Sequence, residues 1–148
     1  MSDTGVAARR TTEQSHQTHR PVGLVGVGLV GTLAAVVVTT LAAALAQAVG
    51  VDFEIPEGGE SIPLAGFAVV AGFFSLVGVV IAVALLRWSA RPAARFIWTA
   101  LSPTAISFVP PLLSGADTAT TATLLGLHLV PAAVMVTTLA RSLRSPTA

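Results

Sequence analysis

The chain alternates between long apolar runs and short polar segments, and this pattern predicts its architecture. Four stretches are almost entirely apolar, namely residues 22–49, 64–86, 96–113 and 119–140. A helix needs about 20 predominantly apolar residues, within a range of about 17–25, to cross the hydrocarbon core of a bilayer. Each stretch therefore predicts a membrane-spanning helix, and together they predict an all-α, integral membrane four-helix bundle over residues 22–140.

The first and third stretches depart from the ideal span. Residues 22–49 are long enough that the helix is expected to tilt or to project beyond the lipid. Residues 96–113 form the shortest stretch and contain Pro103, Pro110 and Pro111. Because a proline removes a helical hydrogen bond, Pro103 is expected to kink this helix and the other two to end it.

The segments that flank the four stretches are polar. Residues 1–21 are rich in Thr, Gln, Ser, His and Arg and show no apolar period. Such a segment cannot bury enough surface to offset the entropy lost on ordering. Residues 1–21 therefore predict a disordered tail, and residues 141–148 predict a second, short tail.

The charged residues are sorted along the chain, and this sorting predicts the orientation. All eight basic residues are arginines, and they precede the first stretch, separate the second from the third, and follow the fourth (Arg9, Arg10, Arg20, Arg87, Arg91, Arg95, Arg141 and Arg144). The other two loops carry the acidic residues Asp52, Glu54, Glu57, Glu60 and Asp117. Because cytoplasmic loops carry an excess of basic residues, four spans place both termini in the cytoplasm. Trp88 and Trp98 flank the basic loop, where interfacial aromatic anchors are expected.

The first stretch has one alternative interpretation. Ala44, Leu45 and Ala46 before Gln47 resemble the cleavage site of a secretory signal peptide that follows an arginine-containing segment. The apolar region of a signal peptide is only about 7–15 residues long, whereas the uncharged stretch before Ala46 is far longer. A retained helix is therefore favoured, and cleavage stays the alternative.

Small residues recur along one face of each of the first two predicted helices. They are Gly28, Thr32, Ala35, Thr39, Ala42 and Ala46 in the first, and Ala68, Ala71, Ser75, Gly78 and Ala82 in the second. Helices associate in membranes through close packing of small residues, so the two seams are expected to pair. Residues 26–31 match the glycine spacing of a dinucleotide-binding fingerprint, but they lack the preceding strand and turn that such a site needs.

Polar residues inside the predicted spans supply the candidate site. His128 is the one ionisable residue within the four stretches, and it falls near the midplane of the bilayer. Hydroxyl groups at similar depth complete a candidate intramembrane polar layer of His128, Thr104, Ser107, Ser102, Ser75 and Thr39. Pro131 and Pro103 are expected to free carbonyl groups beside this layer. The layer holds the helices together through hydrogen bonds, or it serves a ligand, a proton or a haem group.

The composition and the spacing of polar residues argue against several kinds of chemical site. The chain has no cysteine, which excludes disulfides, thiolate metal sites and thiol nucleophiles. Residues 51–60 predict a short acidic hairpin over the outer end of the bundle and match no calcium-loop spacing. His16 and His19 are spaced like metal ligands but lie in the polar tail. No catalytic arrangement is recognisable, so we expect no enzymatic activity, no metal or cofactor, and no nucleic-acid partner.

Three short motifs lie in the acidic loop and in the fourth stretch. They are Val51-Asp52-Phe53, Pro56-Glu57-Gly58-Gly59 and Leu127-His128-Leu129-Val130. In these motifs and in its layout, the chain resembles a family of small four-helix membrane proteins of unknown function from GC-rich actinobacteria. The resemblance implies a bacterial plasma membrane location and assigns no activity.

These patterns favour a non-catalytic accessory or structural membrane component. Such a protein acts through helix contacts within the lipid bilayer, with a membrane partner subunit or with further copies of itself. The first alternative is a small oligomeric transporter or channel with the polar layer around His128 lining its path. A second alternative is an enzyme or a haem protein, in which His128 residues of two chains ligate one iron.

Overall fold

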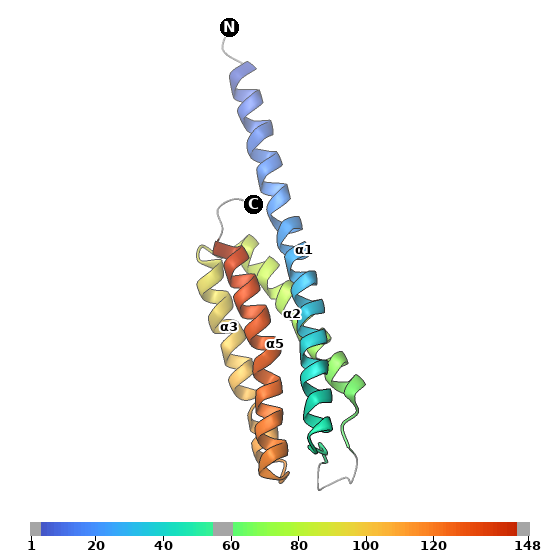
Figure 1. The fold of residues 1–148 in the computed structure, drawn as a ribbon. Coiled ribbons are helices and arrows are strands. Elements are labelled where there is room, and N and C mark those ends of the chain that lie inside the picture. The colour runs from blue at the N-terminus through green and yellow to red at the C-terminus, as the bar shows by residue number, and fades with distance from the viewer. Residues whose placement is uncertain (1–3, 55–60, 145–148) are drawn as a thin grey trace.

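The computed structural model of the protein describes residues 4–54 and 61–144, which form a helical bundle. Its helices are α1 (Thr4–Ala48), α2 (Leu64–Trp88), α3 (Pro92–Ile106), α4 (Val109–Leu113) and α5 (Thr118–Arg144) (Figure 1). Within the described chain, four segments are long and apolar enough to cross a membrane: Pro21–Ala48, Leu64–Trp88, Pro92–Leu113 and Thr118–Arg144. The predicted all-α, membrane four-helix bundle is confirmed, and its third span begins at Pro92 rather than at residue 96.

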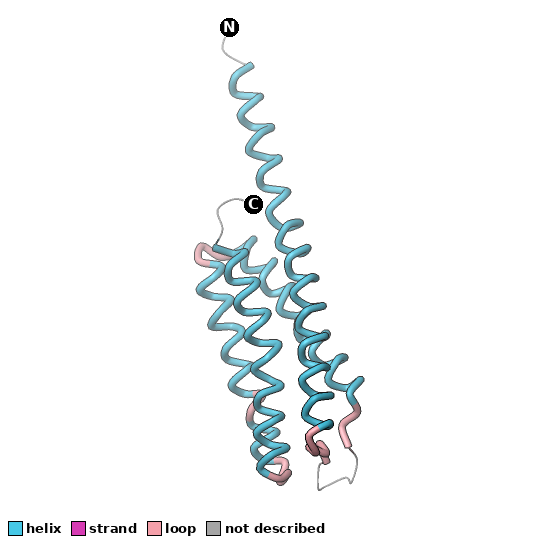
Figure 2. The backbone as a smooth tube through the Cα atoms, viewed as in Figure 1, coloured by secondary structure: helices cyan, strands magenta, loops and turns pink. Residues whose placement is uncertain are grey.

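The four spans are arranged as an up-and-down bundle. α1 packs most extensively against α2 and α5, while α3 packs against α5 and α2, so that α1 and α3 lie diagonally opposite. Figure 2 shows that the loops between spans gather at the two ends of the bundle. Short loops between antiparallel neighbours are typical of this topology.

The interior of the bundle holds two clusters of buried apolar side chains. One comprises Leu24, Ala35, Val79, Ala82, Phe96, Met135, Leu139 and Leu143. The other comprises Ala43, Phe53, Leu124 and Leu127. Lipid tails are as apolar as these side chains, so in a bilayer the clusters stabilise the fold through close packing rather than through removal from water.

The N-terminal part of α1 differs from the sequence prediction. A disordered tail was expected over residues 1–21, whereas α1 begins at Thr4 and continues through Pro21 into the first span. This part of α1 projects beyond the other helices, without a neighbour along most of its length (Figure 1). Once a helix is nucleated, each further residue that joins it gains one backbone hydrogen bond, which offsets the entropy lost when that residue is ordered. The helix of an apolar span can therefore extend into a neighbouring polar segment.

The third span is divided into two helices. α3 ends at Ile106, two residues in a turn follow, and α4 continues from Val109. Pro110 and Pro111 have no N–H group, so the carbonyl groups of two successive residues in the preceding turn receive no helical hydrogen bond. The span is therefore interrupted near the prolines, but the prediction that they end the helix is wrong in position: α3 ends four residues earlier, and both prolines lie in the first turn of α4.

The predicted seams of α1 and α2 face each other. A Cβ atom added to Gly28 of α1 would lie 2.7 Å from Cγ2 of Val79 in α2. A Cβ atom added to Gly72 of α2 would lie 3.4 Å from Cγ2 of Val36 in α1. The buried members of the two seams include Ala35, Thr39, Ala71, Ser75 and Ala82. The buried seam residues and the contact of Gly28 with Val79 agree with packing of α1 against α2 along these faces, although no described atom lies within 4 Å of the Cβ position of Gly78.

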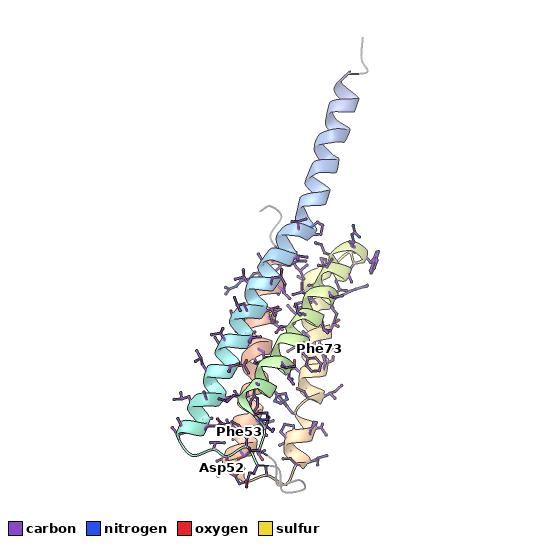
Figure 3. All side chains as sticks on the ribbon, turned by 90° about the vertical axis from the view of Figure 1, so that its right-hand side faces the viewer. Asp52, Phe53 and Phe73 are labelled. Carbon is purple, nitrogen blue, oxygen red and sulfur yellow. The ribbon has the colours of Figure 1, made fainter. Side chains whose placement is uncertain are left out.

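The loop after α1 folds back over one end of the bundle. Phe53, labelled in Figure 3, is fully buried. Its ring lies against that of Phe67 of α2, with the centroids 5.0 Å apart. Glu54 pairs with Ser61 in an isolated antiparallel bridge, and the N–H of Ile62 donates to the carbonyl of Phe53 at 3.3 Å. These contacts agree with the predicted hairpin, of which residues 55–60 lie outside the described residues.

Candidate functional site

His128 lies within α5 and is half-buried. Its Nδ1 is 2.7 Å from the carbonyl oxygen of Leu124, one turn earlier in the same helix. Its ring meets that of Phe108 edge to face, with the centroids 6.5 Å apart. Phe108 belongs to the turn between α3 and α4, so the break in the third span places an aromatic side chain beside the imidazole.

The hydroxyl groups of the third span are satisfied within that span. Thr104 donates to the carbonyl of Ala100 at 2.8 Å, and Ser102 donates to the carbonyl of Trp98 at 3.0 Å. Ser107 donates to the carbonyl of Thr104 at 2.7 Å. These three members of the predicted layer therefore use their donor hydrogens on backbone carbonyls rather than on His128.

Thr39 and Ser75 are the exceptions among the candidate residues. Both are only 3% exposed, and neither hydroxyl has a hydrogen-bond partner in the described part of the chain. By contrast, Thr32 and Thr40 of α1 donate to carbonyls four residues earlier. A buried hydroxyl without a partner is unfavourable by about 1–3 kcal/mol.

The register of the helices divides the predicted polar layer in two. The contacts of Gly28 with Val79 and Leu139 fix how α1 lies against α2 and α5. In that register, Thr39 lies level with His128, whereas Ser75 lies about two turns away, level with Thr32. Two turns of helix span about 11 Å. The sequence missed this division because depth was counted from the outer end of each stretch, and these ends are not level with one another in the packed bundle.

The described charged side chains lie at the two ends of the bundle. Arg87, Arg91, Arg95, Arg141 and Arg144 lie where α2 ends, where α3 begins and where α5 ends, and we name this the arginine-rich end. Asp52, Glu54 and Asp117 lie in the loops at the opposite end, which we name the acidic end. Asp52 and Phe53 mark the acidic end in Figure 3.

Asp117 caps the N-terminus of α5 at the acidic end. Its Oδ1 accepts hydrogen bonds from the N–H groups of Ala119 at 2.7 Å and Thr120 at 3.1 Å. The side chain of Thr120, followed by its backbone N–H, holds the pKa of Asp117 below the ordinary value. A carboxylate at this position satisfies free helix N–H groups and interacts favourably with the helix dipole.

A pocket of about 400 Å³ opens at the arginine-rich end, between the start of α3 and the end of α5. Its lining includes Arg91, Ala93, Ala94, Trp98, Leu143 and Arg144. The sequence predicted the orientation from the arginines and an interfacial anchor at Trp98, but it did not bring Arg91 and Arg144 together. They belong to helices that are distant in the chain, so only the fold reveals their shared pocket.

The described part of the chain contains no group of three or more His, Cys, Asp or Glu side chains arranged to hold a metal ion. His16 and His19 belong to the segment of α1 whose side chains the structure does not describe. The candidate site therefore comprises His128 with Thr39 near mid-bundle, Ser75 at another level, and the pocket at the arginine-rich end.

A bundle of four apolar helices, with its described charged side chains at the two ends, defines the class of a small multi-pass membrane protein. Residues 19–145 match DUF6069, a family of unknown function, and the chain belongs to this family. The match spans the three motifs that carried the resemblance, so membership of a family of unknown function is confirmed. No curated protein and no solved structure matches the chain significantly.

Proposed function

We propose that this protein lies in a bacterial plasma membrane with both termini and the loop between α2 and α3 in the cytoplasm. The support is the separation of charge: the described arginines lie at one end of the bundle, and the described carboxylates lie at the other. Basic residues in short loops are retained on the cytoplasmic side during insertion, whereas acidic residues contribute little to orientation. The arginine-rich end is accordingly the cytoplasmic end.

Within that membrane, the protein is a non-catalytic accessory or structural component that acts through helix contacts. The observation that carries this proposal is the close approach of α1 to α2 at Gly28, where even one added carbon would lie 2.7 Å from Val79. A seam packed this tightly favours a rigid scaffold over a conducting path. Outside the seam, all four spans expose large apolar side chains, including Val30, Phe74, Leu101 and Leu129.

The exposed surface of α1 offers a face for another membrane helix. Among the described residues, no heavy atom lies within 4 Å of the Cβ positions of Gly23 and Gly26, so the backbone there is open to close approach. Val30 and Leu33 continue this surface, with 70% and 66% of their areas exposed. Small residues that let backbones approach closely are enriched where membrane helices associate. A membrane partner subunit is the expected occupant of the surface.

Native mass spectrometry tests this proposal on protein extracted gently from its own host membrane. The proposal expects a stoichiometric complex with a membrane partner subunit. Gly26→Leu, on the exposed face of α1, should abolish the complex. Gly126→Leu, at an open glycine on α5, is the matched control and should leave the complex intact. A bare homo-oligomer that persists with Gly26→Leu would contradict an accessory role.

A small oligomeric transporter is the second candidate, and one observation favours it. The buried hydroxyl of Thr39 has no described partner, and it lies level with His128 in the register of the bundle. An intramembrane polar group without a partner is a feature of solute pathways. Proton flux into proteoliposomes, followed with a trapped pH-sensitive dye, tests this function. Transport predicts flux that His128→Ala abolishes and that Thr137→Ala, at an exposed hydroxyl of α5, leaves unchanged.

A further inference from the structure

The pocket at the arginine-rich end combines three features that suit one kind of ligand. Arg91 and Arg144 contribute positive charge from the start of α3 and the end of α5, Ala93 and Ala94 line the pocket in the first turn of α3, and Trp98 contributes an apolar wall. From this combination we propose that the pocket binds the phosphate of an anionic phospholipid. The inference rests on the membrane location proposed above and goes beyond it, because it assigns a ligand to a particular site.

The two arginines supply the charge that an anion requires. Both are exposed, and the carboxylates whose side chains the structure describes, those of Asp52, Glu54 and Asp117, lie at the opposite end of the bundle. No carboxylate described in the structure therefore competes for the guanidinium groups. Arginine presents a planar array of donors that matches a phosphate group geometrically.

The start of α3 adds donors to the same pocket. Pro92 occupies the first helical position, and the N-cap residue Arg91 provides no side-chain hydrogen bond to the helix. The N–H groups of the first turn have no carbonyl partners within a helix, so those of Ala93 and Ala94 remain available. Helix N-termini favour anions through these N–H groups and through the helix dipole. At α5, which presents its C-terminus to the pocket, Arg141 and Arg144 offset the opposite polarity.

The depth of the pocket distinguishes a lipid from a soluble anion. Trp98 is 72% exposed and lies at the boundary where the apolar part of α3 begins. Tryptophan is enriched at the level of lipid headgroups. Next to Trp98, the exposed side chain of Leu101 continues the apolar surface toward the middle of α3. A phosphate held between Arg91 and Arg144 would thus leave acyl chains free to lie along α3.

Quenching of Trp98 fluorescence measures binding at this pocket directly. The chain has two tryptophans, so full-length protein with Trp88→Phe retains Trp98 as its single reporter. The protein is reconstituted in phosphatidylcholine vesicles that contain either brominated phosphatidylglycerol or brominated phosphatidylcholine at the same mole fraction. The proposal expects stronger quenching by the anionic lipid, with its preference reduced about fivefold by Arg91→Gln and again by Arg144→Gln.

Arg87→Gln is the matched control, because Arg87 is an exposed arginine at the same end that does not line the pocket. It should retain the preference, and far-UV circular dichroism should show all variants equally helical. Equal loss of preference in Arg87→Gln would overturn the proposal in favour of diffuse surface charge. Displacement of the brominated lipid by millimolar inorganic phosphate would overturn it in favour of a soluble anion. Neither outcome bears on the partner complex sought by mass spectrometry, so the two proposals fail separately.

Discussion

The ring of Phe53 lies 5.0 Å from the ring of Phe67, centroid to centroid, and joins the loop after α1 to the first turn of α2. Phe53 makes this contact from a left-handed backbone conformation, with φ at 51°. This conformation is unfavourable for a bulky residue, so burial of the ring must offset the strain. The contact fixes the acidic loop against the end of the bundle.

Replacement of this ring should destabilise the protein strongly. Phe53→Ala is expected to lower the free energy of unfolding in detergent by about 3–5 kcal/mol, because it removes a fully buried aromatic side chain. Phe53→Gly should be less damaging than Phe53→Ala by about 1 kcal/mol, since glycine adopts positive φ without strain. Phe73→Ala, at an exposed position on α2, is the control and should change stability little. Equal effects of Phe53→Ala and Phe73→Ala would contradict the role of the loop contact.

Two glycines of α1 test the close packing of the seam. Alanine is favoured over glycine inside a helix by about 1 kcal/mol at either position, so this gain cancels when the two variants are compared. Gly28→Ala meets Val79, whereas Gly26→Ala enters open space. Gly28→Ala should therefore be less stable than Gly26→Ala by about 1–3 kcal/mol, the usual cost of overpacking. Denaturation followed by circular dichroism measures the difference in stability. Equal stability of the two variants would show that α1 and α2 can move apart enough to accommodate the added methyl group.

The buried hydroxyl of Thr39 distinguishes a structural interior from a functional one. If the hydroxyl has no partner, Thr39→Val removes an unfavourable group and should raise the free energy of unfolding by about 1–3 kcal/mol. Thr32→Val is the comparison, because Thr32 donates to the carbonyl of Gly28 and should show no such gain. Destabilisation by Thr39→Val would instead indicate that the hydroxyl binds water or a solute, which is the outcome that transport requires.

The cap on α5 should give the protein a pH-dependent stability. Hydrogen bonds from Thr120 lower the pKa of Asp117 in the folded state. The stabilisation is therefore complete above the unfolded-state pKa of about 3.9 and is lost as the pH falls through the lower, folded-state pKa. Asp117→Asn keeps a capping oxygen but removes the charge. The melting temperature of the protein should exceed that of Asp117→Asn at pH 7, and the difference should vanish at low pH. If the difference in melting temperature persists unchanged at low pH, the charge of Asp117 is not its cause.

The number and approximate positions of the spans were predictable from the sequence, because length and apolar content alone determine what can cross a bilayer. The facing seams were predictable as well, since small residues repeat at helical spacing on α1 and α2. The helical extension of α1 to Thr4 was not, because residues 4–20 have no apolar pattern that requires a helix.

The candidate site was less predictable than the fold. Which hydroxyls share the level of His128 depends on the register between helices, and register is set by contacts such as that of Gly28 with Leu139. The burial of Phe53 was likewise hidden, because a single aromatic residue among carboxylates resembles an ordinary exposed loop residue. The pocket joins Arg91 to Arg144 only through the packing of α3 against α5.

The orientation of the bundle is tested most directly by single-cysteine labelling, since the chain has no cysteine of its own. Ser61→Cys and Thr118→Cys place a thiol at the acidic end, and Ala90→Cys places one at the arginine-rich end. A membrane-impermeant maleimide applied to intact bacterial spheroplasts should label the first two, and should label Ala90→Cys only after lysis. The reverse pattern would invert the proposed orientation. Labelling of Ser61→Cys without Thr118→Cys in intact spheroplasts would show that the helices α3 and α4 do not together cross the membrane.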